Sequence, residues 1–307
     1  MNNYETIIKD LNQYSKSIEQ SKAYRLGNKL LLSASYIKKL QFIKLFQKIR
    51  SLKWSKSDMR STRWKEHVAR SLSAEFSKEL NPASKIVVYS CITGNYDAPI
   101  SAGCFGGPNI KYVLYTDKLI EDPKGWEVRQ IPEKIRGLSP IAANRYLKLH
   151  PHEFFFADYS IYIDGNIWMT GDPKSLCLAA HNADSGMALF SHAFRDDVFD
   201  ETTACIRLKR GDKKGVKKQA LRGKELGVPR HSGLFEAGVI ATDLGNTVAK
   251  KILECWWDEF LRYDSGRDQV AFIYALKTLN VSVDSIGILG CNIREDDRFI
   301  LKKHLVE

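Results

Sequence analysis

The chain has 307 residues, is 44% hydrophobic and carries a formal net charge of +11. This length allows one large domain or two small ones with a substantial core. No apolar run reaches the ~18 residues that a membrane-spanning helix needs, and residues 1–22 lack the apolar segment of a secretory signal. The six cysteines include no C-x-x-C pair. This argues against a zinc site and a disulfide scaffold and favours a cytoplasmic protein.

The basic surplus is concentrated at the start of the chain. Residues 1–80 hold 17 of the 47 Lys and Arg but only 7 of the 36 Asp and Glu. The nearly neutral remainder gives no reason to expect a nucleic-acid partner. One face of a predicted helix is lined by Phe42, Leu45, Phe46 and Ile49. Residues 30–56 could therefore bind an anionic membrane surface or pack on the following domain, and both alternatives stay open.

From Lys85 onward, predicted strands alternate with predicted helices. Strands are expected at about 85–91, 111–115, 160–163, 186–191 and 237–242. Helices are expected after Ser139-Pro140 and after Asp172-Pro173, and over about 246–263 and 268–279. This alternation predicts a mostly parallel sheet covered by helices on both faces. We therefore expect an α/β domain over residues 81–307, preceded by a basic helical region over residues 1–80.

Polar side chains follow several of these predicted strands. Asp164 and Asn166 come directly after residues 160–163, and Gly165 supplies the turn. The other polar groups at predicted strand ends are Thr93, Asp97, Asp117 and Glu236. Strand ends of a parallel sheet converge at one edge, so these groups are expected to lie together. Asp164 and Asn166 could offer oxygens to a hard cation or a ribose, or they could simply close a turn.

Residues 207–230 contain ten Lys and Arg against two acidic residues. We expect a solvated, mobile loop here, and the functional alternative is a flap that closes over a diphosphate. The chain has no G-x-G-x-x-G, G-x-x-x-x-G-K-[ST], G-x-S-x-G or H-E-x-x-H motif. The absence of these motifs weakens the common nucleotide-cradle, hydrolase and zinc-protease interpretations.

Six colinear segments carry a family resemblance. They are V-Y-S-C-I-T-G-N-Y-D (88–97), Y-L-K-L-H-P-H-E-F-F (146–155), Y-S-I-Y-I-D-G-N (159–166), S-H-A-F-R-D-D-V-F-D-E (191–201), G-L-F-E-A-G-V-I-A-T (233–242) and S-G-R-D-Q-V-A-F (265–272). Together they resemble domain-of-unknown-function family 616, a glycosyltransferase-like family of plant mucilage proteins and bacterial surface-polysaccharide loci. The D-G-N, E-A-G-V and D-Q elements are more distantly similar to retaining, family-eight-type glycosyltransferases. The resemblance covers about residues 85–290 and implies a GT-A-like, Rossmann-like fold.

The resemblance also implies roles for individual positions. Asp164 falls at the first aspartate of the D-x-D motif, which holds a divalent cation (Mn or Mg) and the ribose. Asn166 replaces the second aspartate, which leaves metal dependence open because an amide oxygen is a weaker ligand. The remaining donor-binding candidates are Thr93, Gly94, Asp97, Asp117, Arg145, Lys148, His192 and Arg267. The catalytic candidates, at the donor sugar and the reacting centre, are Asp268, Glu236 and Gln269.

Several of these residues have a structural alternative. Asp97 could cap a turn, and Arg145 could pair with a surface carboxylate. Asp268 could be the N-cap of its own helix. His192 and Arg195 could form a hydrogen-bonded structural pair.

The expected function is transfer of a sugar from a nucleotide-diphosphate donor, with UDP favoured as the nucleotide. The acceptor would be a glycan or lipid-linked glycan of bacterial capsule or lipopolysaccharide. The family-eight likeness favours retention, with Asp268 steadying the anomeric carbon; in an inverting enzyme Asp268 would be the general base. The expected location is the cytoplasm or the inner face of the plasma membrane. The alternative is a catalytically inactive glycan- or nucleotide-binding protein, which the Asn166 replacement favours.

Overall fold

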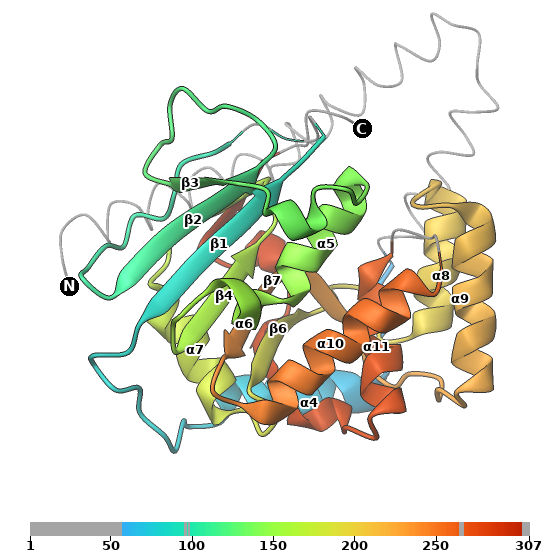
Figure 1. The fold of residues 1–307 in the computed structure, drawn as a ribbon. Helices are drawn as coiled ribbons and strands as arrows, with labels where there is room; N and C mark the ends of the chain where they lie inside the picture. Colours follow the sequence, from blue (N-terminus) through green and yellow to red (C-terminus); the bar gives the residue numbers. More distant parts are fainter. Residues whose placement is uncertain (1–56, 95–96, 98, 264–266, 303–307) are drawn as a thin grey trace, which may run out of the picture. The chain divides into compact units, whose positions relative to one another are not determined.

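The computed structural model describes residues 57–94, 97, 99–263 and 267–302 (Figure 1). The described residues from Met59 onward belong to one compact unit. The predicted front-end helix at Phe42 and the proposed membrane-surface segment 30–56 lie outside the described residues. In the part of the chain that is described, each helix is too short or too polar to cross a bilayer.

A seven-stranded sheet with the order β3-β2-β1-β4-β7-β6-β8 forms the centre of this unit. Its strands are β1 (Ile86–Ile92), β2 (Ile110–Thr116), β3 (Glu127–Gln130), β4 (Tyr159–Ile163), β6 (Met187–Ser191), β7 (Phe235–Asp243) and β8 (Gly287–Gly290). All of them run in one direction except β7, which is antiparallel to both of its neighbours. A separate two-stranded ladder joins β5 (Ile167–Met169) to β9 (Phe299–Leu301). The predicted α/β class with a mostly parallel sheet is confirmed.

Helices cover both faces of the sheet, as Figure 1 shows. They are α4 (Thr62–Ser73), α5 (Pro140–Leu149), α6 (Pro151–Phe154), α7 (Pro173–Asn182), α8 (Val198–Leu208), α9 (Lys213–Glu225), α10 (Thr247–Leu261) and α11 (Asp268–Thr278). The short 3-10 helices are Glu133–Ile135, Val283–Ser285 and Ile293–Glu295. One buried cluster joins α4, α5, α10 and α11 to one face of the sheet. A second cluster joins α7 and β9 to the other face.

The predicted helix starts are confirmed by their caps. The Ser139 hydroxyl accepts a hydrogen bond from the Ala142 backbone N–H, and Pro140 begins α5. Asp172 caps α7 in the same way, with a proline at the first helical position. The local sequence therefore fixed where these helices begin, and in particular the orientation of α5, which carries two site residues.

Helix α4 packs on the α/β body. The Trp64 ring is 4% exposed, meets the Phe235 ring edge-on and donates from Nε1 to Ser191 Oγ at 3.1 Å. The compact unit thus begins before α4, whereas the sequence placed the boundary after residue 80. Because residues 1–80 are basic overall, the sequence pattern did not reveal that one turn of α4 is buried.

Strand direction brings the predicted site residues to one edge of the sheet. The carboxyl ends of β1, β2, β4 and β6 lie at this edge, together with the amino end of β7. The β6–β7 register shifts between Leu189 and Phe190, and Phe190 lies opposite Glu236. Such bulges re-aim side chains beside functional sites.

Replacing Trp64 by alanine should lower the free energy of unfolding by about 3–5 kcal/mol, since it removes a buried indole and its hydrogen bond. Urea denaturation followed by circular dichroism measures this loss. The matched control is Leu72→Ala on the same helix, because Leu72 is 44% exposed and should cost less than about 1 kcal/mol. Equal losses for the two variants would show that α4 is not part of the folded body.

Candidate active site

A buried ion cluster centred on Asp268 lies at this edge of the sheet. Lys148 Nζ, from α5, lies 2.7 Å from Asp268 Oδ2, and Arg145 Nε lies 2.9 Å from the same oxygen. The Lys148 and Asp268 side chains are only 1% and 7% exposed. Burial alone would raise the pKa of Asp268, but Arg145, Lys148 and Arg267 together hold it far below its usual range. Asp268 is therefore a fixed anion.

Asp268 is the first residue of α11, and its second oxygen is also occupied. Oδ1 accepts a hydrogen bond from the Gln269 backbone N–H at 3.0 Å. The residue before the helix, Arg267, makes no side-chain cap. Asp268 is therefore not the N-cap that the structural alternative proposed; it bonds the first turn of its own helix and also neutralises two cations. With both oxygens engaged and a lowered pKa, this carboxylate is poorly suited to accept a proton.

Lys148 also links Asp268 to Asp164. Lys148 Nζ lies 3.8 Å from Asp164 Oδ1, and the Asp164 side chain is 36% exposed. The Asp164 backbone N–H donates to the Gly238 carbonyl at 2.9 Å, which fixes the end of β4 against β7. A Cβ at Gly238 would lie 3.2 Å from Asp164 Oδ2, so the missing side chain gives this carboxylate its room. Asp164 is hence the accessible member of the cluster.

The predicted metal ligands provide a sparse donor set. The Asn166 amide nitrogen donates to the Lys302 carbonyl at 3.0 Å, which orients this side chain toward the chain after β9. Among the described residues, no three His, Cys, Asp or Glu side chains form a metal-binding group. Asp97 Oδ2 would lie 3.5 Å from a Cβ placed on Gly165, beside Asp164. These residues could supply only a minority of the ligands of a divalent cation, and substrate phosphates would supply the rest.

The residues after β1 and β2 hold their own loops together. The Thr93 hydroxyl donates to the Pro140 carbonyl at 2.8 Å, and Asp117 Oδ2 accepts from the Gly94 backbone N–H at 2.9 Å. Gly94 has φ +65°, and a Cβ there would come within 2.9 Å of Pro140. These contacts join β1, β2 and the start of α5. These candidate donor-binding residues therefore lie at the predicted edge of the sheet. The side chains of Thr93 and Asp117, however, are used for hydrogen bonds within the protein.

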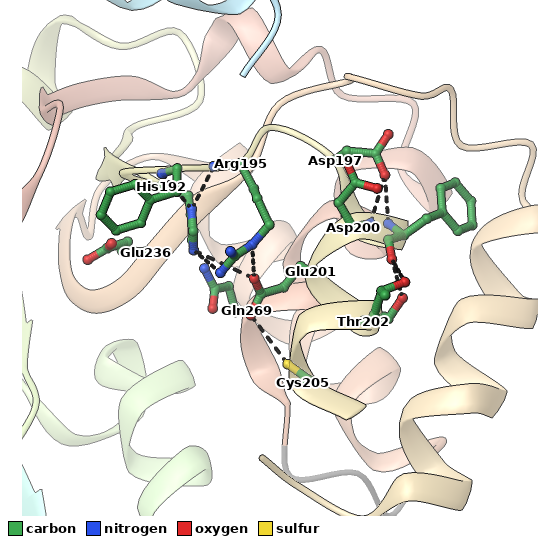
Figure 2. A network of polar contacts seen from close by, with 12 residues as sticks. His192, Arg195, Asp197, Asp200, Glu201, Thr202, Cys205, Glu236 and Gln269 are labelled. Atoms are coloured by element: carbon green, nitrogen blue, oxygen red, sulfur yellow. Dashed lines mark hydrogen bonds and ion pairs between the residues drawn. The ribbon is translucent and has the colours of Figure 1, made fainter. Parts of the chain in front are cut away.

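A second buried network lies beside the first, and Figure 2 shows it around Glu201. Glu201 Oε2 accepts from Arg195 Nε at 2.7 Å, and Cys205 Sγ donates to Oε1 at 3.3 Å. Arg267 Nη2 lies 3.5 Å from Glu201 Oε1. Burial alone would raise the pKa of Glu201, but the charges of Arg195 and Arg267 and the hydrogen bond from Arg195 hold it below its usual range. Glu201 thus fixes the arginine that precedes Asp268.

The His192 ring is committed to protein groups. Its Nδ1 accepts hydrogen bonds from the backbone N–H groups of Phe194 and Arg195 at 3.1 and 3.0 Å. Its Nε2 lies 3.6 Å from Glu201 Oε2. Burial lowers the pKa of His192 to about 3, so the ring is neutral. This arrangement is the hydrogen-bonded pair with Arg195 that we set against a donor-binding role.

Gln269 and Glu236 complete the edge. Gln269 Nε2 donates to the Phe235 carbonyl at 2.7 Å and its Oε1 accepts from Arg267, so α11 is tied to the start of β7. Glu236 follows Phe235 on β7, the strand whose first carbonyl this glutamine contacts. Burial raises the pKa of Glu236, and Arg294 Nη1 lies 3.5 Å from its Oε1. A carboxyl group with a raised pKa at such an edge is suited to proton transfer or to contact with a sugar hydroxyl.

Sequence reasoning missed Glu201 and misjudged the basic segment. Glu201 ends a motif singled out for the resemblance and pairs with Arg195 of the same motif, but its other partner, Arg267, comes from a distant part of the chain. The expectation of a mobile loop or flap at residues 207–230 is wrong, because residues 213–225 form α9. Asp212 caps this helix by accepting from the Gly215 N–H, and Val216, Gln219 and Gly223 are buried at helical spacing. The many lysines concealed this signal.

A comparison with protein families identifies the family of this chain. A family model described as TOD1/MUCI70, glycosyltransferase-like domain, matches residues 143–296. This match includes Lys148, Asp164, Glu201, Glu236 and Asp268. The chain therefore belongs to the TOD1/MUCI70 glycosyltransferase-like domain family. Glycosyl transfer is the activity class that this membership supports. A search of curated proteins finds no significant match.

Solved structures that match part of this chain include three glycosyltransferases. The bifunctional glycosyltransferase WbbM, in its apo form, is 18% identical, with 71% of this chain and 41% of WbbM covered and a TM-score of 0.42. The galactosyltransferase LgtC, solved with donor and acceptor sugar analogues, is 15% identical, with 66% and 72% covered and a TM-score of 0.35. Mouse xyloside xylosyltransferase 1 is 10% identical, with 67% and 86% covered and a TM-score of 0.40. The matched region spans less than half of WbbM.

Replacing Asp268 by asparagine should lower the free energy of unfolding at neutral pH by about 3–5 kcal/mol, since it leaves two cations buried without their shared anion. Because the native state lowers the pKa of Asp268, its contribution is present above the unfolded value of about 4 and is lost as the pH falls through the lower folded value. The stability of the variant should thus fall less than that of the wild type when the pH drops below about 4.

Urea unfolding at a series of pH values measures this difference. Asp184→Asn is the control, because Asp184 lies outside the cluster in the turn after α7. A constant gap in stability between the wild type and Asp268→Asn across the acid range would contradict the assigned ion cluster.

Proposed function

We propose that this protein transfers a sugar from a nucleoside-diphosphate donor, with UDP as the nucleotide, to a glycan or lipid-linked glycan acceptor. The observation that carries the proposal is Lys148, a buried ammonium group between the exposed Asp164 and the buried Asp268. A fixed cation beside an accessible carboxylate at the carboxyl edge of a sheet suits a phosphate-bearing ligand. Family membership supports the glycosyl transfer class.

The cationic side chains would stabilise the departing diphosphate. Arg145 and Lys148 are held in place by Asp268 before any donor binds, so they lose little freedom during the reaction. In the free protein the Asp268 carboxylate already balances their charges. Neither cation is therefore left unpaired before a diphosphate binds. Electrostatic stabilisation of the leaving group is the largest contribution such a site could make.

Asp164 would contact the donor ribose and hold a divalent cation, together with the Asn166 amide oxygen and the donor's own phosphates. The cation, Mn or Mg, would add positive charge at the bridging oxygens of the diphosphate when bound. The nucleotide base would lie against the loops that follow β1 and β2, which are held by Thr93, Gly94, Asp97 and Asp117.

Glu236 and Gln269 would contact the donor sugar. Glu236 has a raised pKa and lies beside the strand bulge, so it is better suited than Asp268 to exchange a proton with a sugar or acceptor hydroxyl. Asp268 has no unoccupied oxygen for an inverting general base. Its role would be to fix Arg145 and Lys148. Retention is supported by the likeness of the D-G-N, E-A-G-V and D-Q elements to family-eight-type enzymes.

The acceptor and the location extend the proposal further. A bacterial surface polysaccharide, either capsule or lipopolysaccharide, is the proposed product, and the inner face of the plasma membrane is the proposed location. The sequence supports this location through the basic composition of residues 1–80.

A second candidate function is binding without turnover. It is favoured by the engagement of both Asp268 oxygens and by the orientation of the Asn166 amide toward Lys302. Such a protein would bind a nucleotide sugar or glycan and release no nucleoside diphosphate.

Incubation with a panel of sugar nucleotides, with and without manganese, should release UDP from at least one donor. Lys148→Met should lower that rate about a hundredfold, because it removes a preorganised cation from the leaving group. Lys174→Met, at an exposed position of helix α7, is the matched control and should leave the rate unchanged. Binding of a donor without any release would support the second candidate, and neither binding nor release would reject both.

A further inference from the structure

The pair of helices α8 and α9 carries the most strongly basic surface among the described residues that the proposed reaction does not use. The exposed basic side chains are Arg207, Lys209, Arg210, Lys213, Lys214, Lys217, Lys218 and Lys224. Between residues 207 and 225 the acidic residues are Asp212, which caps α9, and Glu225; Asp200 and Glu201 lie in the first turn of α8. Figure 1 shows α8 and α9 side by side at one edge of the fold, beyond α11.

The exposed residues of α9 form one continuous face. At about 100° per residue, Lys213, Lys224, Lys217, Leu221, Lys214 and Lys218 fall within an arc of roughly 140°, and the exposed Glu225 at the last turn is the one acidic residue in that arc. Leu221 lies near the middle of this arc and is 56% exposed. The helix therefore presents a leucine surrounded by lysines to solvent.

The opposite face of α9 is fixed on the body. Gln219 is fully buried. Its side-chain Nε2 donates to the Arg267 backbone carbonyl at 3.0 Å, and its backbone carbonyl accepts from the Tyr274 hydroxyl at 2.7 Å. A Cβ at Gly223 would lie 2.7 Å from the Tyr274 oxygen, so α9 packs closely on α11. The lysine-bearing face is thus held rigidly outward. The same helix touches the residue that precedes Asp268.

We propose that this face of α9 docks the protein on an anionic membrane surface. Lysines suit a diffuse layer of charged headgroups, whereas a specific phosphate is more often gripped by the forked geometry of arginine. All five exposed cations of α9 are lysines. The exposed leucine at the centre of the lysines adds an apolar contact that a membrane rewards and a soluble polyanion does not. Helix α9 contacts the residue before Asp268 through the Gln219–Arg267 hydrogen bond, so docking through α9 would bring the edge of the sheet close to lipid-linked molecules.

The test uses the full chain and sedimentation with vesicles of phosphatidylcholine, with or without phosphatidylglycerol. The wild type should bind the anionic vesicles, bind neutral vesicles weakly, and lose binding as salt rises. The triple variant Lys213→Gln, Lys217→Gln and Lys224→Gln should bind about a hundredfold more weakly, at about fivefold for each lysine. The matched control is Lys111→Gln, Lys174→Gln and Lys251→Gln, which removes the same charge from exposed positions on β2, α7 and α10 and should bind nearly as the wild type does.

A second variant separates a membrane from a soluble polyanion. Leu221→Gln should weaken vesicle binding about tenfold, because it removes the apolar contact, and should leave binding to dextran sulfate unchanged. Circular dichroism and UDP release should match the wild type for all these variants, so a failure of docking is distinguishable from a failure of the proposed reaction. Vesicle binding that is insensitive to the triple variant would overturn the proposal. Vesicle binding insensitive to Leu221→Gln, together with tight binding to dextran sulfate, would identify a soluble polyanion instead and also overturn it.

Discussion

The site depends on one shared carboxylate. Lys148 is almost fully buried, and an ammonium group in that position is tolerated only with a close anion. Asp268 supplies that anion and at the same time pairs with Arg145, so α5 is fixed to the start of α11. Through Lys148 the same contact reaches Asp164 at the end of β4. Three elements that are distant in the sequence are thereby held in one arrangement by a few charged atoms.

The neighbouring network extends this logic. Glu201 holds Arg195 and lies beside Arg267, and the neutral His192 ring fixes the backbone that carries Arg195. Each buried cation in these two networks lies near a buried carboxylate, and this pairing offsets the free-energy cost of removing the charges from water. The chemistry that such a site supports is stabilisation of an added diphosphate by charges that are already in place. Glu236 is better suited to proton transfer, because burial raises the pKa of its carboxyl group.

The sequence predicted the parts of this arrangement that depend on local pattern and strand direction. Ser139-Pro140 and Asp172-Pro173 marked helix starts because capping is local. The convergence of Asp164 with Thr93 and Asp117 followed from the rule that strand ends of a parallel sheet share an edge, whereas the place of Asp268 at this edge was implied only by the family resemblance. The antiparallel direction of β7 could not be predicted, because a single apolar strand has the same pattern in either direction. Glu201 was missed because its partners are set by tertiary packing, and α9 was misjudged because its lysines outnumber the few buried residues of its inner face.

A double-mutant cycle on Lys148→Met and Asp268→Asn tests the shared carboxylate most directly. Urea unfolding would be measured for the wild type, the two single variants and the double variant. The account predicts strong coupling: the double variant should lose less stability than the two single losses combined, by about 1–3 kcal/mol, because each single change leaves a buried charge without its partner. Losses that add to within about 0.5 kcal/mol would contradict it, since independent sites behave in that way.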